Sequence, residues 1–113
     1  MKKCGVTAIV PCYCCSDTIE RAFYSVVNQT VLPKEVILVD DASPDHGRTL
    51  SILHGLKQKF NETLDIRILA FEKNQGPASA RNAGWEAATQ PFIAFLDADD
   101  SWHPRKLEVQ YQW

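Results

Sequence analysis

Four short stretches of the chain are almost continuously apolar, and each is bounded by polar, glycine or proline residues. They cover residues 6–10, 36–39, 66–70 and 92–96. Short apolar runs of this kind, the first two rich in β-branched residues, are typical of strands buried on both faces of a sheet. We therefore predict four strands, the first of them stopped by Pro11.

The segments between these runs repeat apolar residues every three or four positions, which predicts helices with one buried face. The predicted helices are a first one that ends near residue 28, a second over 48–60, a third over 77–88 and a last one from 104 to near the C-terminus. Ser16 or Asp17 can cap the first helix. Pro77 and Pro104 suit the first turn of the helices that they begin.

Strands that alternate with helices predict a single α/β domain over residues 1–113. Its sheet is open, mainly parallel and Rossmann-like, with helices on both faces. All four strands then end at the same edge of the sheet, where such folds bind ligands. The segments at this edge are 11–15, 40–45, 74–77 and 97–100, and they carry most of the chain's unusual polar residues. We predict the ligand site there.

The segment after the fourth strand brings Asp97, Asp99 and Asp100 close together. Carboxylates packed this closely repel one another, and a hard divalent ion with oxygen ligands relieves the repulsion. This pattern predicts a site for Mn²⁺ or Mg²⁺. Asp100 has an equally good structural explanation, because it can cap the turn that follows.

Composition narrows the function classes. The chain has 45% hydrophobic and 23% charged residues and a formal net charge of −2, which is ordinary for a folded domain. Because there is no excess of positive charge, we expect no nucleic-acid partner. No apolar run approaches the roughly 20 residues of a transmembrane segment. We expect a cytoplasmic protein, with a peripheral place at the inner membrane face as the alternative.

Four motifs together resemble family-2 glycosyltransferases over nearly the whole chain. They are residues 9–13 (IVPCY), 39–43 (VDDAS), 74–84 (NQGPASARNAG) and 95–100 (FLDADD). The resemblance implies a GT-A fold, a nucleotide-diphosphate sugar as donor, a divalent metal and transfer with inversion at the anomeric carbon. It also implies a glycan or lipid-linked acceptor and a role in polysaccharide biosynthesis. A metal would neutralise the diphosphate as it leaves.

Carried over by similarity, the expected nucleotide-binding residues are Pro11, Tyr13, Asp40, Asp41, Asn74, Gly76, Arg81 and Asp97. The resemblance gives Asp41 the imide of a uracil base, with Tyr13 stacked on that base. Arg81 would reach back toward the base and the first acidic group. Asp99, in the Asp-x-Asp motif, would bind the metal, and Asp97 would reach the ribose or the metal through water.

Three alternatives stay open. The spacing Cys12-x-x-Cys15 is that of thioredoxin-like thiol proteins, although it leaves both acidic loops unexplained. The strand-end Asp-x-Asp also resembles haloacid-dehalogenase-like phosphatases, which carry it on the first strand. Finally, the chain could bind nucleotide without catalysis, because the family's general base is expected beyond residue 113. A truncated sheet would expose the strand at 92–96, so we also expect self-association as a homo-oligomer.

Overall fold

The computed structural model describes residues 2–111, and its sheet has the predicted parallel architecture. The strands are β1 (Lys3–Cys12), β2 (Leu32–Asp40), β3 (Asp65–Ala70) and β4 (Phe92–Phe95), in the order β3-β2-β1-β4. Every pairing is parallel. The helices are α1 (Ile19–Val27), α2 (Arg48–Phe60), α3 (Pro77–Ala87) and α4 (Lys106–Gln110). The predicted α/β class with a mainly parallel sheet is confirmed.

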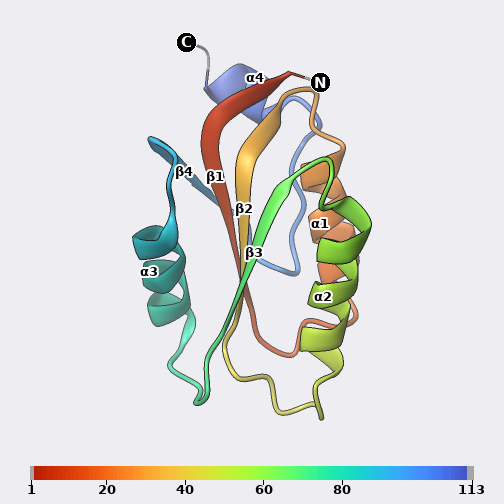
Figure 1. The fold of residues 1–113 in the computed structure, drawn as a ribbon, viewed down its shortest axis with the longest axis vertical. Coiled ribbons are helices and arrows are strands. Elements are labelled where there is room, and N and C mark those ends of the chain that lie inside the picture. The colour runs from red at the N-terminus through yellow and green to blue at the C-terminus, as the bar shows by residue number, and fades with distance from the viewer. Residues whose placement is uncertain (1, 112–113) are drawn as a thin grey trace.

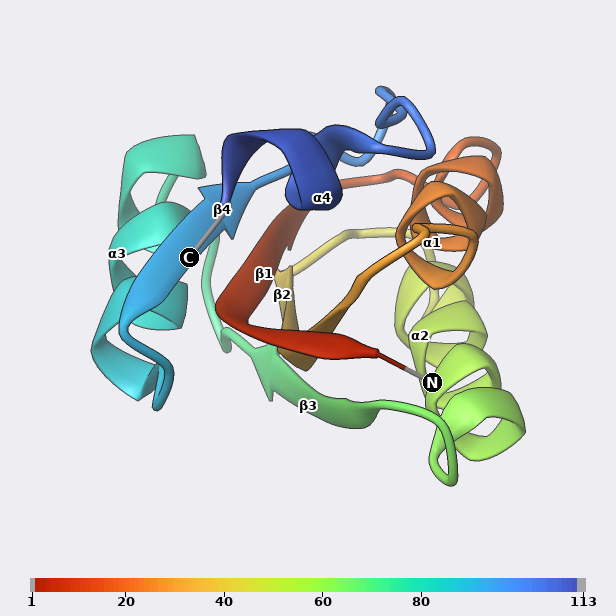
Figure 2. The same ribbon diagram turned by 90° about the horizontal axis from the view of Figure 1, so that it is seen from above.

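Side chains of β1 alternate between two apolar layers, as the period of a strand requires. Ala8 and Val10 pack with the buried faces of α1 and α2. Ile9 lies on the opposite face, in a cluster with Ile37 and with Ala80 of α3. Figures 1 and 2 show the result, with α3 on one side of the sheet and α1 and α2 on the other.

The helix α4 lies at the end of the sheet where the strands begin, away from their carboxyl ends (Figure 1). Its Leu107 is fully buried in a cluster with Val6 and Ala94. The buried side chain of Gln29 fixes the approach to this helix: its amide nitrogen donates to the His103 carbonyl at 2.7 Å, and its oxygen accepts from the Leu107 N–H at 3.1 Å. This end of the domain is thereby closed.

Pro11 does not stop the first strand, which continues to Cys12. The reason lies in the pairing of β1 with β4, which ends where Ile9 meets Phe95. Residues two apart in a strand direct their backbone groups to the same neighbour, so the missing N–H of Pro11 faces β4 beyond the last pair. No hydrogen bond is lost there. The strand therefore runs two residues further than predicted.

Other boundaries also differ from the prediction. The second strand begins at Leu32, because residues 32 and 33 pair with the start of β1. Neither Ser16 nor Asp17 caps α1; its cap residue is Thr18, without a side-chain cap bond, and the Cys15 carbonyl accepts from the Thr18 and Ile19 N–H groups. The last helix begins at Lys106 rather than at 104. Its predicted continuation over 112–113 lies outside the described residues.

A buried carboxylate ties the end of α3 to the sheet. The Thr7 hydroxyl and the Thr89 N–H donate to Glu35 Oε1 at 2.8 and 2.9 Å, and Arg67 lies 3.5 Å from Oε2. Arg67 also donates to the Ala87 carbonyl at 2.6 Å. Burial raises the pKa of Glu35, but these hydrogen bonds outweigh it and lower the pKa below its usual value.

Replacing Glu35 by glutamine should make stability less dependent on acid. At neutral pH, Glu35→Gln should lower the free energy of unfolding by about 1 to 3 kcal/mol, because its amide NH₂ would face Arg67. A carboxyl with a depressed folded pKa stabilises above its unfolded pKa of about 4.3 and loses this effect as pH falls through the folded value. In urea denaturation, the difference in unfolding free energy between the unchanged protein and Glu35→Gln should therefore narrow below about pH 4. Glu62→Gln, at an exposed residue, is the control. A free-energy difference that stays constant from pH 3 to 7 would show that the Glu35 carboxylate does not stabilise the fold.

The helix α3 approaches the sheet closely because Gly84 has no side chain. A Cβ at this position would lie 2.5 Å from Ile9 Cγ2, and Ile9 is fully buried. Gly84→Ala should therefore destabilise the fold by about 1 to 3 kcal/mol through overpacking. Gly55, in the middle of α2, has open space around it. Gly55→Ala should stabilise by about 0.5 to 1 kcal/mol in the same urea titration, and equal effects of the two changes would refute the packing argument.

Candidate functional site

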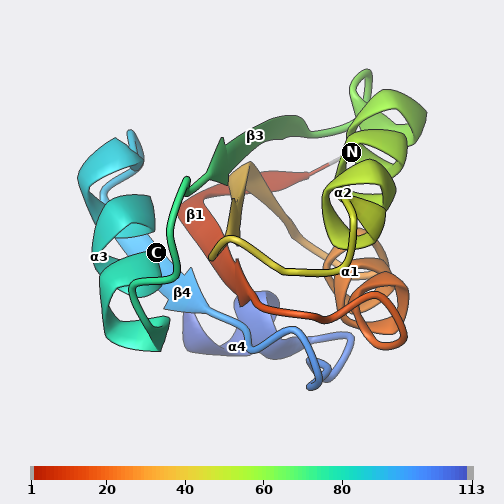
Figure 3. The ribbon, with the colours of Figure 1, turned by 90° about the horizontal axis from the view of Figure 1, so that it is seen from below.

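The carboxyl ends of the strands enclose a cavity of about 730 Å³. Figure 3 looks onto this edge, where the segments that follow the strands converge. The residues that line the cavity are Pro11, Cys12, Tyr13, Cys14, Cys15, Thr18, Asp41, Asn74, Gly76, Pro77, Ala80, Arg81, Asp97, Ala98 and Asp99. They come from all four predicted strand-end segments, from the first turns of α3 and, in Thr18, from the start of α1. The sheet edge predicted from sequence is thus a single concave site.

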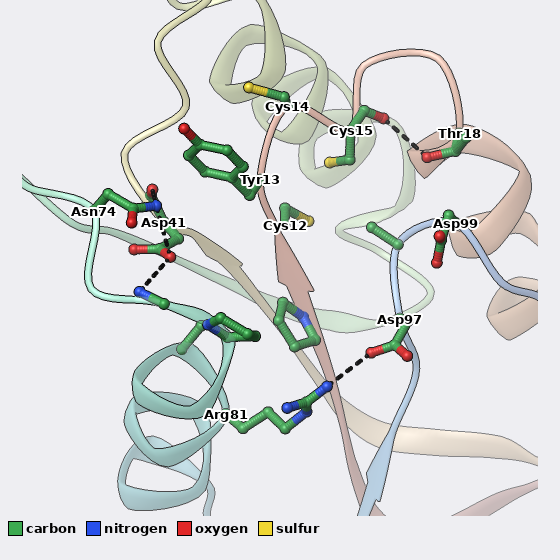
Figure 4. Close-up of a pocket in the computed structure, with 15 residues that line it drawn as sticks. Cys12, Tyr13, Cys14, Cys15, Thr18, Asp41, Asn74, Arg81, Asp97 and Asp99 are labelled. Carbon is green, nitrogen blue, oxygen red and sulfur yellow. Dashed lines mark hydrogen bonds and ion pairs between the residues drawn. The ribbon is translucent and has the colours of Figure 1, made fainter.

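Asp41 is the anchor of the site (Figure 4). Its buried carboxylate accepts from the Gln75 N–H at 2.7 Å, the Gly76 N–H at 2.9 Å and the Asn74 side chain at 3.0 Å. These bonds fix the turn that opens α3 against the end of β2. Gly76 needs its lack of a side chain here, because its φ of 94° lies in the left-handed region.

Asp40, its neighbour, is placed differently. Asp40 does not line the cavity, and its side chain accepts from the hydroxyl of Ser43 at 2.6 Å and from the Ser43 N–H at 3.2 Å. The Ser43 oxygen in turn accepts from the Cys14 N–H at 2.9 Å. Sequence analysis missed Ser43, although its place in the 39–43 motif was a usable signal.

Tyr13 and Pro11 line the wall formed by the end of β1. Tyr13 is 52% exposed, which leaves a large part of the residue free to contact a ligand. In Figure 4 this ring lies on the same side of the cavity as Asp41 and Asn74. A flat aromatic surface beside a hydrogen-bonding carboxylate is chemically suited to a nucleobase.

Arg81 contacts a different acidic group from the one expected. Its guanidinium lies 3.3 Å from Asp97 Oδ1, and the two side chains are 40% and 55% exposed. Arg81 and Asp97 pair across the cavity (Figure 4), and the expected reach of Arg81 toward the base stays a prediction. An ion pair this exposed contributes about 1 kcal/mol or less, so a ligand can replace it.

Asp99 lies at the other end of the same loop and is exposed. Its backbone carbonyl accepts from the Arg21 guanidinium of α1 at 2.6 Å, which holds the loop against the helix. No motif in the sequence marks Arg21, which explains why sequence analysis missed it. Asp100 does not line the cavity; its carboxylate accepts from the Ser101 N–H at 3.1 Å, and its expected role as a cap stays a prediction.

The acidic loop fits a metal ion that is shared with a ligand. Within residues 2–111, no group of three or more His, Cys, Asp and Glu side chains is arranged to hold a metal by itself. The available donors are the exposed carboxylates of Asp97 and Asp99, which line one cavity. Mg²⁺ is commonly bound by one or two carboxylates together with substrate phosphates, and hard oxygen donors suit Mn²⁺ as well.

The three clustered cysteines carry free thiols. Cys12 and Cys15 are buried, whereas Cys14 is exposed to the cavity. A hydrogen bond between the thiols of Cys12 and Cys15, together with burial, raises the pKa of Cys12 well above its usual range. The same bond lowers the pKa of Cys15. Cys12 thus stays protonated.

An open parallel sheet whose strand ends gather an exposed tyrosine, an anchored carboxylate and an acidic loop is typical of α/β proteins that bind a ligand at this edge. The family model described as glycosyl transferase family 2 matches residues 7–113, and the chain belongs to this family. Two of the alternatives, the thioredoxin-like and the haloacid-dehalogenase-like readings, are therefore wrong. The strand order agrees, because the acidic loop follows β4 and not β1.

Known proteins of similar sequence or structure are glycosyltransferases. The UDP-Glc:alpha-D-GlcNAc-diphosphoundecaprenol beta-1,3-glucosyltransferase WfgD of Escherichia coli is 38% identical over 105 residues, which are 93% of this chain and 39% of that protein. Staphylococcus aureus TarS 1-349 in complex with UDP-GlcNAc superposes with a TM-score of 0.76 at 33% identity, over 96% of this chain and 29% of the other.

The mannosyltransferase PcManGT from Pyrobaculum calidifontis, in complex with GDP-Man and Mn²⁺, superposes with a TM-score of 0.77 at 28% identity. The match covers 91% of this chain and 30% of that one. These neighbours confirm the GT-A type of fold. The chain spans less than half the length of the curated relatives it matches. Among residues 2–111, no helix has the length and apolar character needed to cross a bilayer.

Replacing Asp41 by asparagine should weaken the hydrogen bonds that hold the turn before α3. Either orientation of the amide would place its NH₂ against a backbone N–H, of Gln75 or of Gly76. Asp41→Asn should therefore cost about 1 to 3 kcal/mol of stability. Urea denaturation measures the change, with Asp17→Asn as the exposed control of equal charge. Equal stability of the two variants would show that the anchor does not hold the turn.

Proposed function

We propose that this chain is the donor-binding part of an inverting glycosyltransferase that uses a uridine-diphosphate sugar. The observation that carries the proposal is the cavity itself, which places Tyr13 and the anchored Asp41 at one end and the Asp97–Asp99 loop at the other. A nucleoside diphosphate has the same polarity, with a flat base at one end and a diphosphate at the other. TarS bound to UDP-GlcNAc supports a uridine donor.

In this proposal Tyr13 stacks on the base, Asp41 accepts from its imide, and Pro11, Asn74 and Gly76 shape the wall around it. Among the described residues, the Asp41 Oδ1 atom accepts from one donor, the Gln75 N–H, and therefore keeps a lone pair for the ligand. Base recognition and loop anchoring can then share one carboxylate.

The acidic loop would hold Mn²⁺ or Mg²⁺ through Asp99, with Asp97 on the ribose or on a metal-bound water. When bound, the metal neutralises the charge that develops on the departing diphosphate. Arg81, which is partly exposed beside Asp97, can turn to a phosphate oxygen when the ion pair opens. The complex of PcManGT with GDP-Man and Mn²⁺ supports a divalent ion in this fold.

The sugar acceptor would bind outside the described cavity. We place the general base beyond residue 113, so the chain alone should bind donor without transferring sugar. The acceptor would be a glycan or a lipid-linked glycan, as the name of WfgD states for that protein. Such a substrate suits a cytoplasmic enzyme or one at the inner membrane face, and the expected homo-oligomer stays a prediction.

Calorimetric titration with UDP tests the proposal. UDP should bind in the presence of Mn²⁺ and more weakly in EDTA, and GDP should bind more weakly than UDP. Asp99→Ala should lower the Mn²⁺-dependent affinity by at least about tenfold, the lower end of the effect of even an outer-shell partner of a metal ligand. Asp100→Ala removes the same charge from the same loop but from outside the cavity, and it should bind like the unchanged protein.

Each part of this titration tests a different element of the proposal: the metal site, the preference for uridine and the donor site itself. Binding that neither EDTA nor Asp99→Ala weakens would overturn the metal site and leave the base site standing. Tighter binding of GDP than of UDP would overturn the uridine assignment. Absence of binding by either nucleotide would overturn the donor site in this chain.

A further inference from the structure

A hydrogen-bond relay joins the first strand-end segment to the second. The Cys14 N–H donates to Ser43 Oγ at 2.9 Å, and the Ser43 hydroxyl donates to Asp40 Oδ1 at 2.6 Å. The Ser43 N–H donates to the same carboxylate oxygen at 3.2 Å. Asp40 is only 5% exposed and belongs to the end of β2. The relay therefore runs from a rigid strand end to an exposed turn.

The backbone on both sides of this relay is strained. Cys14 has a φ of 51° and Ala42 a φ of 53°, both in the left-handed region, and neither residue is glycine. Such conformations persist only where the surroundings fix them. The Ser43 side chain supplies this restraint, because it bonds to the Cys14 backbone on one side and to Asp40 on the other. Without its hydroxyl, the turn at Cys14 loses that restraint.

This turn carries Tyr13, which is half exposed and lines the cavity. Figure 4 shows Tyr13 and Cys14 above Asp41, on the segment that leaves β1. Consecutive residues of β2 and its loop therefore act on two different segments. Asp41 anchors the turn before α3, while Asp40 anchors the turn at Tyr13 through Ser43. The separation between Tyr13 and Asp41 depends on this pair of anchors.

We infer that Ser43 and Asp40 are positioning residues for base recognition, which hold Tyr13 at the correct distance from Asp41. The inference rests on the proposed function, since it assumes that a nucleobase lies between these two residues. It gives Asp40 a role different from the direct nucleotide contact that the family resemblance implied. Asp40 acts through Ser43 and the backbone of Cys14, and it touches no ligand.

The exposed thiol of Cys14 reports on the turn without any nucleotide. Cys4, Cys12 and Cys15 are buried, so a maleimide should alkylate Cys14 first, as peptide mass spectrometry can verify. Ser43→Ala should increase this rate several-fold, because the released turn lets the already exposed thiol move away from the carboxylates of Asp45 and Asp40. Ser43→Thr keeps the hydroxyl and should restore the slower rate. Ser51→Ala, the same change on the exposed side of α2, should have no effect. The Ser43 and Ser51 changes leave the charge of Asp40 intact, which matters because partial desolvation and the charges of Asp45, Cys15 and Asp40 raise the pKa of Cys14.

The same variants test the link to binding. In Mn²⁺, Ser43→Ala should weaken UDP binding by about five- to tenfold, the equivalent of one lost hydrogen bond, in a protein that still unfolds cooperatively. Ser43→Thr should bind normally. Asp40→Asn keeps the Oδ1 acceptor and should bind UDP within about threefold of the unchanged protein, whereas Asp40→Ala should lose at least as much affinity as Ser43→Ala.

Each outcome decides a separate question. An unchanged alkylation rate in Ser43→Ala would overturn the relay, whether or not UDP binds. A loss of affinity in Asp40→Asn as large as in Asp40→Ala would overturn the positioning role and return Asp40 to direct contact. If the unchanged protein fails to bind UDP, the proposed function fails, and the inference about base recognition falls with it. The alkylation rates would still show whether Ser43 restrains the turn.

Discussion

The parallel alignment of the strands is the constraint on which the rest of this molecule depends. Because β1 pairs in parallel with both β2 and β4, all strand ends point to one edge of the sheet. Residues far apart in the sequence, such as Tyr13, Asp41 and Asp97, thereby meet in one cavity. Two further contacts hold α3 against this sheet: its close packing at Gly84 and the hydrogen bond from Thr89 to the buried Glu35.

Two carboxylates of the cavity, those of Asp41 and Asp97, differ in burial and in how firmly they are held. Asp41 is 3% exposed, and three donors hold its carboxylate in place. The Asp97 side chain is 55% exposed and pairs with Arg81 at 3.3 Å. Exposed charges are the ones that a ligand or metal can recruit at low cost, because little existing structure is lost. The site is thus held firmly at Asp41 and loosely at Asp97.

The sequence predicted the element order, the parallel sheet and the edge that carries the site. It could do so because apolar runs and helical spacing record burial directly, as they do for α2 from Arg48 to Phe60. Contacts between distant segments leave no such local record. The bond from Arg21 to the Asp99 carbonyl and the pairing of Arg81 with Asp97 depend on how loops meet in space. Pro11 misled for a related reason, since its effect depends on which neighbour its nitrogen faces.

The charges that line the cavity also limit what can bind there. Asp97 and Asp99 stand against one cationic side chain, Arg81, among the cavity-lining residues of the described chain. A diphosphate brings further negative charge, and the protein as a whole, at a formal net charge of −2, supplies no compensating field. Repulsion between phosphate and carboxylate would dominate unless a divalent cation lay between them. The acidic loop and a diphosphate would therefore be compatible only as a three-part complex, in which both bind the cation and the affinity for either partner depends on the other.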